Sequence, residues 1–333
     1  RFLFLCGRCT ISRCGVSRKR LYMKSILIYL KQYIKVDFSI AYYGAVLGFL
    51  ALSIGVNYYL DFEDSIIDSY YGKGIRIFYF FLFYAFAYYG TCLIMMVFKS
   101  QSTLFGNKWF WIKSLFILSV LALDAGFHYH DNFVRAEFPP AMQYFARKVS
   151  KNLINIGTMI VPMLVFYHLL DKEKNKFYGL TWHNFNYKPY LFMLGVMIPV
   201  ILLASFIDNF SNFYPIYKSN PAHTFLGTDE WFPAILYELA YGWNFLTIEL
   251  AFRGFMILGL TSIMGRNVVL PMVATYCFYH FGKPAGEAIS SIVGGYILGV
   301  IALESRSIFG GVLIHVGVAW LMELFAWLQK EVY

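Results

Sequence analysis

Long, continuously apolar segments constrain this chain more than any other feature of its sequence. Segments such as 38–60, 76–98 and 308–328 reach the roughly 20 apolar residues that an α-helix needs to cross a hydrocarbon core. Their residues do not alternate between apolar and polar, as those of a membrane barrel strand would. Charged residues make up 14% of the chain, against about 25% in an ordinary soluble domain. The sequence therefore predicts an all-α fold, a polytopic transmembrane helix bundle.

The apolar segments predict about eight or nine membrane spans. The nine candidates cover residues 38–60, 76–98, 110–127, 153–170, 190–210, 231–260, 268–281, 288–303 and 308–328. The chain then divides into three parts. Residues 1–37 form a basic N-terminal arm, residues 38–210 form a transmembrane scaffold with few buried charges, and residues 231–328 form the core that carries the chemically interesting side chains.

The basic residues are placed as in a membrane protein with a cytoplasmic N-terminus. They gather in the N-terminal arm and in loops near 99–108 and 172–176, which fall on one side of the membrane. We therefore expect a cell inner-membrane protein, and the net charge of +9 does not indicate binding to nucleic acid. Residues 1–22 differ in composition from the rest and are excluded from the fold prediction. They are either translated upstream sequence or a basic arm that contacts anionic lipid.

Four ionisable residues of the C-terminal part stand in or beside apolar segments: Glu249, Arg253, His280 and His315. Glu249 and Arg253 are four residues apart, so on a helix they share a face and can form an ion pair. Ionisable side chains at membrane depth face the protein interior and commonly serve function. A carboxylate with two imidazoles can activate water. The same three groups could instead bind a divalent metal such as zinc, but we favour chemistry without a metal or other cofactor.

The order of these residues resembles a known family. The chain is similar to the three motifs of the CPBP (CAAX-protease and bacteriocin-processing, or Abi) family of intramembrane proteases, in the segments Ile248-Glu249-Leu250-Ala251-Phe252-Arg253-Gly254, Tyr276-x-x-x-His280 and Ser307-Ile308-x-Gly310-Gly311-x-x-x-His315. The resemblance covers roughly residues 231–320. It implies an endopeptidase that hydrolyses peptide bonds of membrane-associated substrates, either CAAX-processing-like or bacteriocin-processing-like. Its partners would be membrane lipids and a peptide or protein substrate.

The resemblance also implies roles for the four ionisable residues. Glu249 would activate water, His280 and His315 would orient the water and stabilise the oxyanion, and Arg253 would hold the glutamate. The structural alternative is that Glu249 and Arg253 form an ion pair that fixes helix packing, and that the two histidines are ordinary core residues.

The chain departs from the family motifs at two polar positions. Ile248 stands where the family has its first glutamate, and Ala319 stands where the family has an asparagine. The carboxylates that could compensate are Glu238, Glu287 and Glu323. These departures indicate a divergent member and define the main alternative, a catalytically inactive scaffold that binds another membrane protein or confers immunity. A transporter ranks last, because the two halves of the chain show no internal repeat. The family also has phenylalanine at the position of Tyr276, which we interpret as a mild change.

Overall fold

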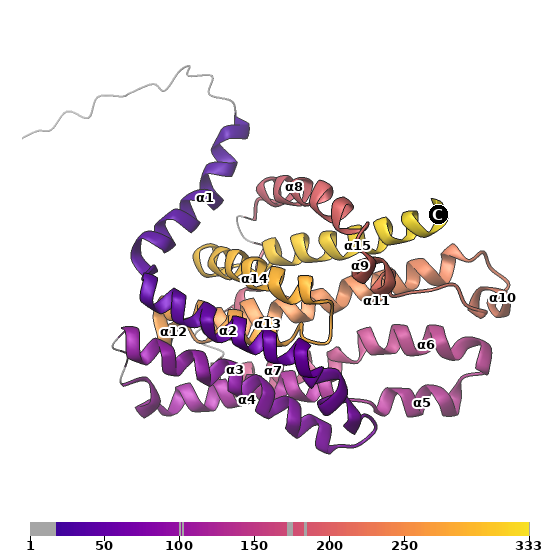
Figure 1. Cartoon of the computed structure of the whole chain (residues 1–333), viewed down its shortest axis with the longest axis horizontal. Helices are drawn as coiled ribbons and strands as arrows, with labels where there is room; N and C mark the ends of the chain where they lie inside the picture. The colour runs from indigo at the N-terminus through magenta and orange to yellow at the C-terminus, as the bar shows by residue number, and fades with distance from the viewer. Residues whose placement is uncertain (1–17, 100, 102, 172–175, 183–184, 333) are drawn as a thin grey trace, which may run out of the picture.

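The computed structural model describes residues 18–99, 101, 103–171, 176–182 and 185–332, and over these residues it contains helices and no β-strand. Figure 1 shows the helices arranged largely side by side along one axis. The α-helices are α1 (Arg18–Asp37), α2 (Ile40–Leu60), α3 (Ile75–Lys99), α4 (Lys108–Gly126), α5 (Tyr129–Glu137), α6 (Pro140–Leu153), α7 (Val161–Phe166), α8 (Lys188–Ala204), α9 (Asp208–Phe213), α10 (Ala222–Leu226), α11 (Trp231–Glu249), α12 (Thr261–Met264), α13 (Val269–Phe278), α14 (Ala285–Ser305) and α15 (Phe309–Val332).

Seven helical stretches of the described chain are long and apolar enough to cross a membrane. They are Ile40–Leu60, Ile75–Lys99, Lys108–Glu137, Pro140–Asp171, Trp231–Phe278, Ala285–Ser305 and Phe309–Lys330. Large apolar side chains on their outer faces, such as Val97 at 76% and Leu169 at 75%, are exposed as lipid-facing residues would be. The prediction of an all-α integral membrane protein is therefore confirmed.

Three of the expected segments differ in form. Segment 190–210 is represented by α8, an apolar helix of 17 residues that is shorter than the seven long stretches. Segment 268–281 is represented by α13, which has 10 residues and follows the preceding span within one long helical stretch. Segment 110–127 is represented by α4 within a longer helical stretch, Lys108–Glu137, that includes α5, and α6 follows it. Pro140 occupies the first turn of α6, where its missing N–H leaves no internal hydrogen bond unmade. The N-terminal residues 1–17 lie outside the described part of the chain, and residues 18–37 are helical.

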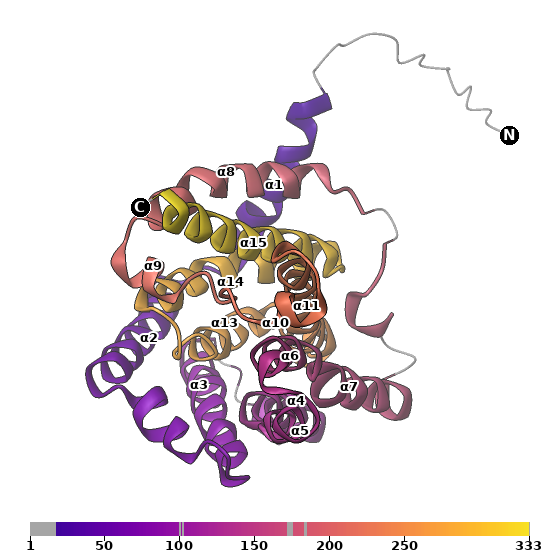
Figure 2. The same ribbon diagram turned by 90° about the vertical axis from the view of Figure 1, so that its right-hand side faces the viewer.

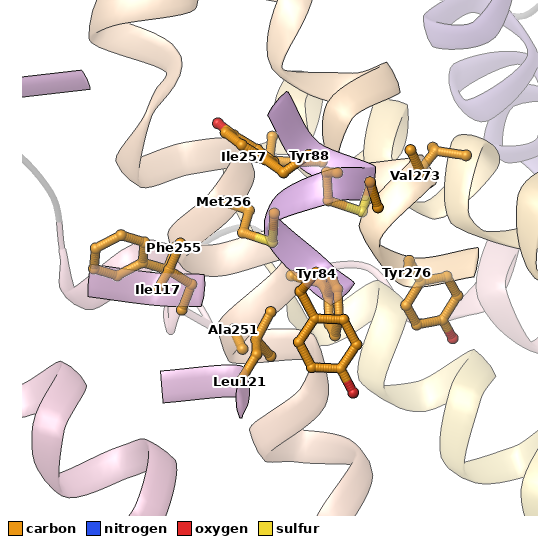
Figure 3. Packing of buried hydrophobic residues seen from close by; sticks show 14 of the residues in the cluster. Tyr84, Tyr88, Ile117, Leu121, Ala251, Phe255, Met256, Ile257, Val273 and Tyr276 are labelled. Carbon is orange, nitrogen blue, oxygen red and sulfur yellow. The ribbon is translucent and has the colours of Figure 1, made fainter. Parts of the chain in front are cut away.

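The C-terminal core lies in the middle of the bundle. Viewed along the bundle in Figure 2, α11 and α13 are central, with α14 and α15 on one side and α3 and α4 on the other. The chain after α11 continues directly into the π-helix η7 (Leu250–Gly259), and every residue of η7 is buried. In Figure 3, aromatic and aliphatic side chains of α3 and α4 surround the residues of η7, including Ala251, Phe255 and Met256. A segment buried on all sides is the most rigid place from which to present a charged side chain.

The π-helical form of η7 is accompanied by close packing against the short 3₁₀ turn η6 (Phe177–Gly179). Tyr178 of this turn has left-handed backbone angles, φ 52° and ψ 40°. A Cβ atom on Gly254 would come within 2.7 Å of the Tyr178 carbonyl oxygen, and one on Gly259 within 3.1 Å of its ring. Position 254 therefore requires glycine for this approach, whereas a side chain at position 259 would need the Tyr178 ring to shift slightly. Such π segments are rare and are frequently found at functional sites.

Candidate functional site

Glu249 and Arg253 form the ion pair that their spacing predicts. Glu249 is the last residue of α11, Arg253 lies in the first turn of η7, and neither is accessible to solvent. Arg253 Nη1 lies 3.0 Å from Glu249 Oε1. A buried carboxylate is costly without an opposite charge, so the guanidinium is the group that allows Glu249 to remain at this depth.

His315 of α15 contacts the same carboxylate. Its Nδ1 lies 3.0 Å from Glu249 Oε1. A carboxylate paired with arginine is an acceptor, so Nδ1–H of His315 donates this bond and Nε2 carries the lone pair. The first turn of α15 comes close because Gly311 has no side chain: a Cβ atom at this position would overlap Glu249 Oε2. The carboxylate thus lies against the side of α15, beside its first two turns.

Tyr276 of α13 connects the groups of the site. Its hydroxyl lies 3.2 Å from His315 Nε2, and with the tautomer assigned above the hydroxyl donates this bond. The guanidinium carbon of Arg253 lies 4.3 Å from the centre of the Tyr276 ring, within cation–π range. A hydrogen-bonded chain therefore runs from Glu249 through His315 to Tyr276. The change from phenylalanine to tyrosine at this position is more than the mild change expected from the sequence.

His280 bonds to Tyr276, and among the described residues no hydrogen bond joins it to the Glu249 carboxylate. It stands in the connection between α13 and α14, and its Nδ1–H donates to the Tyr276 carbonyl oxygen over 2.8 Å. Its ring packs edge-on against Tyr276, with ring centres 4.5 Å apart. Burial lowers the pKa of His280 well below 6.5, and the charge of Lys283 acts in the same direction. His280 is therefore neutral near pH 7, with Nε2 as its remaining acceptor.

The four predicted site residues thus gather around Tyr276, but not as a metal centre. Within the described residues, the group of three candidate ligand atoms that lie within 4.8 Å of one another belongs to Glu63, Asp64 and Asp68 instead. That acidic group lies in and after the π-helix η1 (Phe62–Ile67), and Asp68 already pairs with Arg76 over 2.6 Å. The arrangement of Glu249, His280 and His315 does not match the close ligand set of a zinc site.

The two positions that depart from the family motifs are apolar in structure as well as in sequence. Ile248 is 5% exposed and Ala319 is 3% exposed, and both belong to the main hydrophobic core. Glu249 faces His315 while its neighbour Ile248 packs into that core. The helix therefore presents the second, not the first, of the two motif positions to the histidine.

Of the three carboxylates that might have compensated for Ile248, those of Glu323 and Glu287 make other contacts, whereas Glu238 Oε2 is buried without a hydrogen-bond partner among the described residues. Both oxygens of Glu323 accept from the backbone N–H of Ile216, at 3.0 Å each. Glu287 accepts a hydrogen bond of 2.6 Å from the Tyr214 hydroxyl. Glu238 is in α11, where its backbone oxygen accepts from Trp320. These interactions assign the first two side chains to loop and helix packing.

Several polar atoms of the site are buried without a hydrogen-bond partner among the described protein groups. They are Glu249 Oε2 and the three guanidinium nitrogens of Arg253. The contact of Arg253 Nη1 with Glu249 Oε1 is an ion pair, but it does not have the geometry of a hydrogen bond. Nearly all buried polar groups in proteins have a partner, so such a cluster marks a place suited to a polar molecule. One acceptor oxygen and several N–H donors suit a water molecule or a peptide carbonyl group.

No known protein family, curated protein or solved structure matches this chain.

Proposed function

We propose that this protein is an intramembrane endopeptidase of the CPBP type that uses glutamate and histidine to activate water. The observation that supports the proposal most is the fully buried Glu249 carboxylate, held at 3.0 Å by both His315 and Arg253 inside a polytopic helix bundle. A buried ion pair alone is weak support for function. The added histidine, the tyrosine behind it and the unpartnered oxygen make up a site with an acceptor and donors for a reaction.

In this proposal each polar group has one task. Glu249 Oε2 accepts a proton from the attacking water and returns it to the peptide nitrogen as the C–N bond breaks, while Oε1 is held in place by His315 and Arg253. The unpartnered N–H groups of Arg253 donate to the oxyanion that forms on the peptide carbonyl. His280, neutral with its Nε2 free to accept, orients the water molecule. The oxyanion role that the resemblance gives to the histidines therefore passes to Arg253.

We place the protein in the cell inner membrane with its basic end in the cytoplasm. Figure 1 shows the C-terminal end of α3, the N-terminal end of α4 and the short helix α12 at one end of the bundle; Lys99 ends α3, Lys108 begins α4 and Arg266 follows α12. The positive-inside rule assigns that end to the cytoplasm. The seven long helical stretches of the described chain, one of which includes α13, and the shorter apolar helix α8 support the proposal of about eight spans. Membrane lipids and a peptide substrate are the partners, without nucleic acid or metal.

A second candidate is a catalytically inactive scaffold of the same fold. The apolar packing of Ile248 and Ala319 favours it, because both positions are polar in the family that the sequence resembles. In that case the ion pair and the histidines serve helix packing, and the protein acts by binding another membrane protein.

Reconstitution into proteoliposomes distinguishes the two candidates. The purified protein is incubated with two peptide pools, one ending in a lipidated cysteine followed by a short apolar tail and one of hydrophobic leader peptides, and new peptide ends are mapped by mass spectrometry. The proposal expects the wild type and Glu238→Gln to produce the same new peptide ends. Glu249→Gln should produce none of them. Glu238→Gln is the matched control, since it removes another carboxylate of α11. Identical peptide ends with all three proteins would reject peptidase activity at this site.

A further inference from the structure

A separate cavity opens at the end of the bundle where η7 ends. Its volume is about 430 Å³, and it is lined by Thr261, Gly265, Arg266, Leu303, Glu304 and Arg306. These residues come from α12, the 3₁₀ turn η8 (Gly265–Val268) and the C-terminal end of α14. The volume falls in the usual range for small-molecule sites. None of the lining residues belongs to the site around Glu249.

One of the two arginines in this cavity is already neutralised and fixed. Arg266 forms an ion pair with Glu304 across the cavity wall. Its guanidinium carbon lies 5.5 Å from the centre of the Tyr33 ring, and the Tyr33 hydroxyl donates to the Arg266 carbonyl oxygen over 2.8 Å. These contacts tie α1, η8 and α14 together. They also hold the guanidinium of Arg266 in position at the cavity.

The second arginine supplies the net positive charge. Arg306 caps the C-terminal end of α14 with left-handed backbone angles, φ 56° and ψ 26°, and its side chain is exposed. Among the described residues no carboxylate pairs with it. The cavity therefore carries two guanidinium groups against the single carboxylate of Glu304. Guanidinium groups bind phosphate oxygens through paired N–H donors, so the cavity is suited to a phosphate anion.

The position of the cavity along the bundle indicates which molecule would carry the phosphate. The lining residues come in part from α12, which Figure 1 shows at the same end of the bundle as the end of α3 and the start of α4, where Lys99 and Lys108 stand. Trp182, which is 67% exposed and stacks on Phe309 with ring centres 3.5 Å apart, lies where the chain enters α15 after Arg306. Exposed tryptophan and basic residues together mark the level of the lipid headgroups.

We propose that this cavity binds the headgroup phosphate of an anionic membrane lipid. Arg306 provides the unpaired charge, and Arg266 adds further N–H donors. The bound lipid joins the end of α14 to α12 and η8, the segments that follow η7. This proposal does not depend on the peptidase function.

Lipid retention measured by native mass spectrometry tests the proposal. The purified wild type is equilibrated with micelles that contain equal amounts of phosphatidylglycerol and phosphatidylcholine. Arg306→Asn removes the charge, and asparagine tolerates the left-handed backbone at this position. Arg306→Lys keeps the charge. The matched control is Lys108→Asn, which removes an exposed basic residue at the same end outside the cavity.

We expect the wild type to retain phosphatidylglycerol over phosphatidylcholine, and Arg306→Asn to reduce that preference roughly fivefold, the effect of about one basic contact. Arg306→Lys and Lys108→Asn should keep most of the preference. Equal losses in Arg306→Asn and Lys108→Asn would overturn the proposal, because the effect would then be one of overall charge. In a second arm inorganic phosphate is added as competitor. Full displacement of the lipid by phosphate at equal concentration would make a soluble phosphate the ligand and would reject the membrane source.

Discussion

Replacing Gly311 with alanine tests the contact on which the site depends. A Cβ atom on Gly311 would overlap Glu249 Oε2, so the carboxylate has to move away from the first turn of α15. That movement weakens its bonds to His315 and Arg253, both now at 3.0 Å. The matched control is Gly294→Ala in α14, where a Cβ atom meets no other atom within 4 Å.

The two substitutions should change stability in opposite directions. Alanine is favoured over glycine in a helix by about 0.5–1 kcal/mol, and Gly294→Ala should show this gain in the free energy of unfolding. Gly311→Ala has the same gain but loses a hydrogen bond to a charged group, a cost of about 1.5–3 kcal/mol. We therefore expect a net loss of about 0.5–2.5 kcal/mol for Gly311→Ala.

Chemical unfolding in mixed micelles, followed by circular dichroism, measures both changes. Peptide cleavage by the same samples should fall in Gly311→Ala and remain in Gly294→Ala. If Gly311→Ala is stabilised as much as Gly294→Ala and cleaves at the wild-type rate, the approach of α15 to Glu249 is not as described.

Three further predictions concern pH and buried charge. Because burial holds the pKa of His280 well below 6.5, the unfolded chain binds more protons below that pH, and the free energy of unfolding falls with decreasing pH. Unfolding curves of His280→Asn should show a smaller loss of this free energy between about pH 7 and pH 5. The same pH dependence as the wild type would contradict the assignment. Burial raises the pKa of Glu63 from 4.5 to about 8, so the stability of the fold decreases as pH rises through this interval. Glu63→Gln should therefore raise the melting temperature more at about pH 8 than at about pH 4.5, and an equal effect at both pH values would refute the prediction. Lys113 and Asp171 form a buried ion pair, with Nζ and Oδ2 2.7 Å apart. Lys113→Met alone should lower the free energy of unfolding by about 3–5 kcal/mol, whereas the double variant Lys113→Met with Asp171→Leu should recover much of this loss. A double variant as unstable as the single one would contradict the role of the pair.

The bundle and part of the site could be predicted from the sequence for simple physical reasons. Apolar length specifies membrane helices, because every backbone polar group in lipid must be paired within the segment. The spacing of Glu249 and Arg253 specifies their contact, because it lies within one helix. The approach of His315 to Glu249 involves two helices, so no local spacing predicts it, and in the sequence only the resemblance to the family motifs indicates it.

Other features depend on tertiary packing that no local pattern reveals. The π-helical form of η7 accompanies the close approach of Tyr178 to Gly254 and Gly259, residues more than 70 positions away in the sequence. The sequence assigns Tyr276 only a mild change from the motif, because a phenol that contacts a histidine looks the same in sequence as one that faces lipid, and the chain contains 27 tyrosines. His280 lies beside Tyr276 because a histidine at the end of α13 can bond back to the carbonyl four residues earlier.

The central claim is that Glu249 and His315 act as one catalytic unit, and a double-mutant cycle on peptide cleavage tests it most directly. The rates of the wild type, Glu249→Gln, His315→Gln and the double variant are compared on one peptide that the wild type cleaves. Each single change should reduce the rate by about 10²–10⁴-fold, the usual range for general acid–base groups. The double variant should be little slower than the slower single variant, because residues that act together lose their effect together. Losses that multiply independently, or full cleavage by Glu249→Gln, would contradict the account.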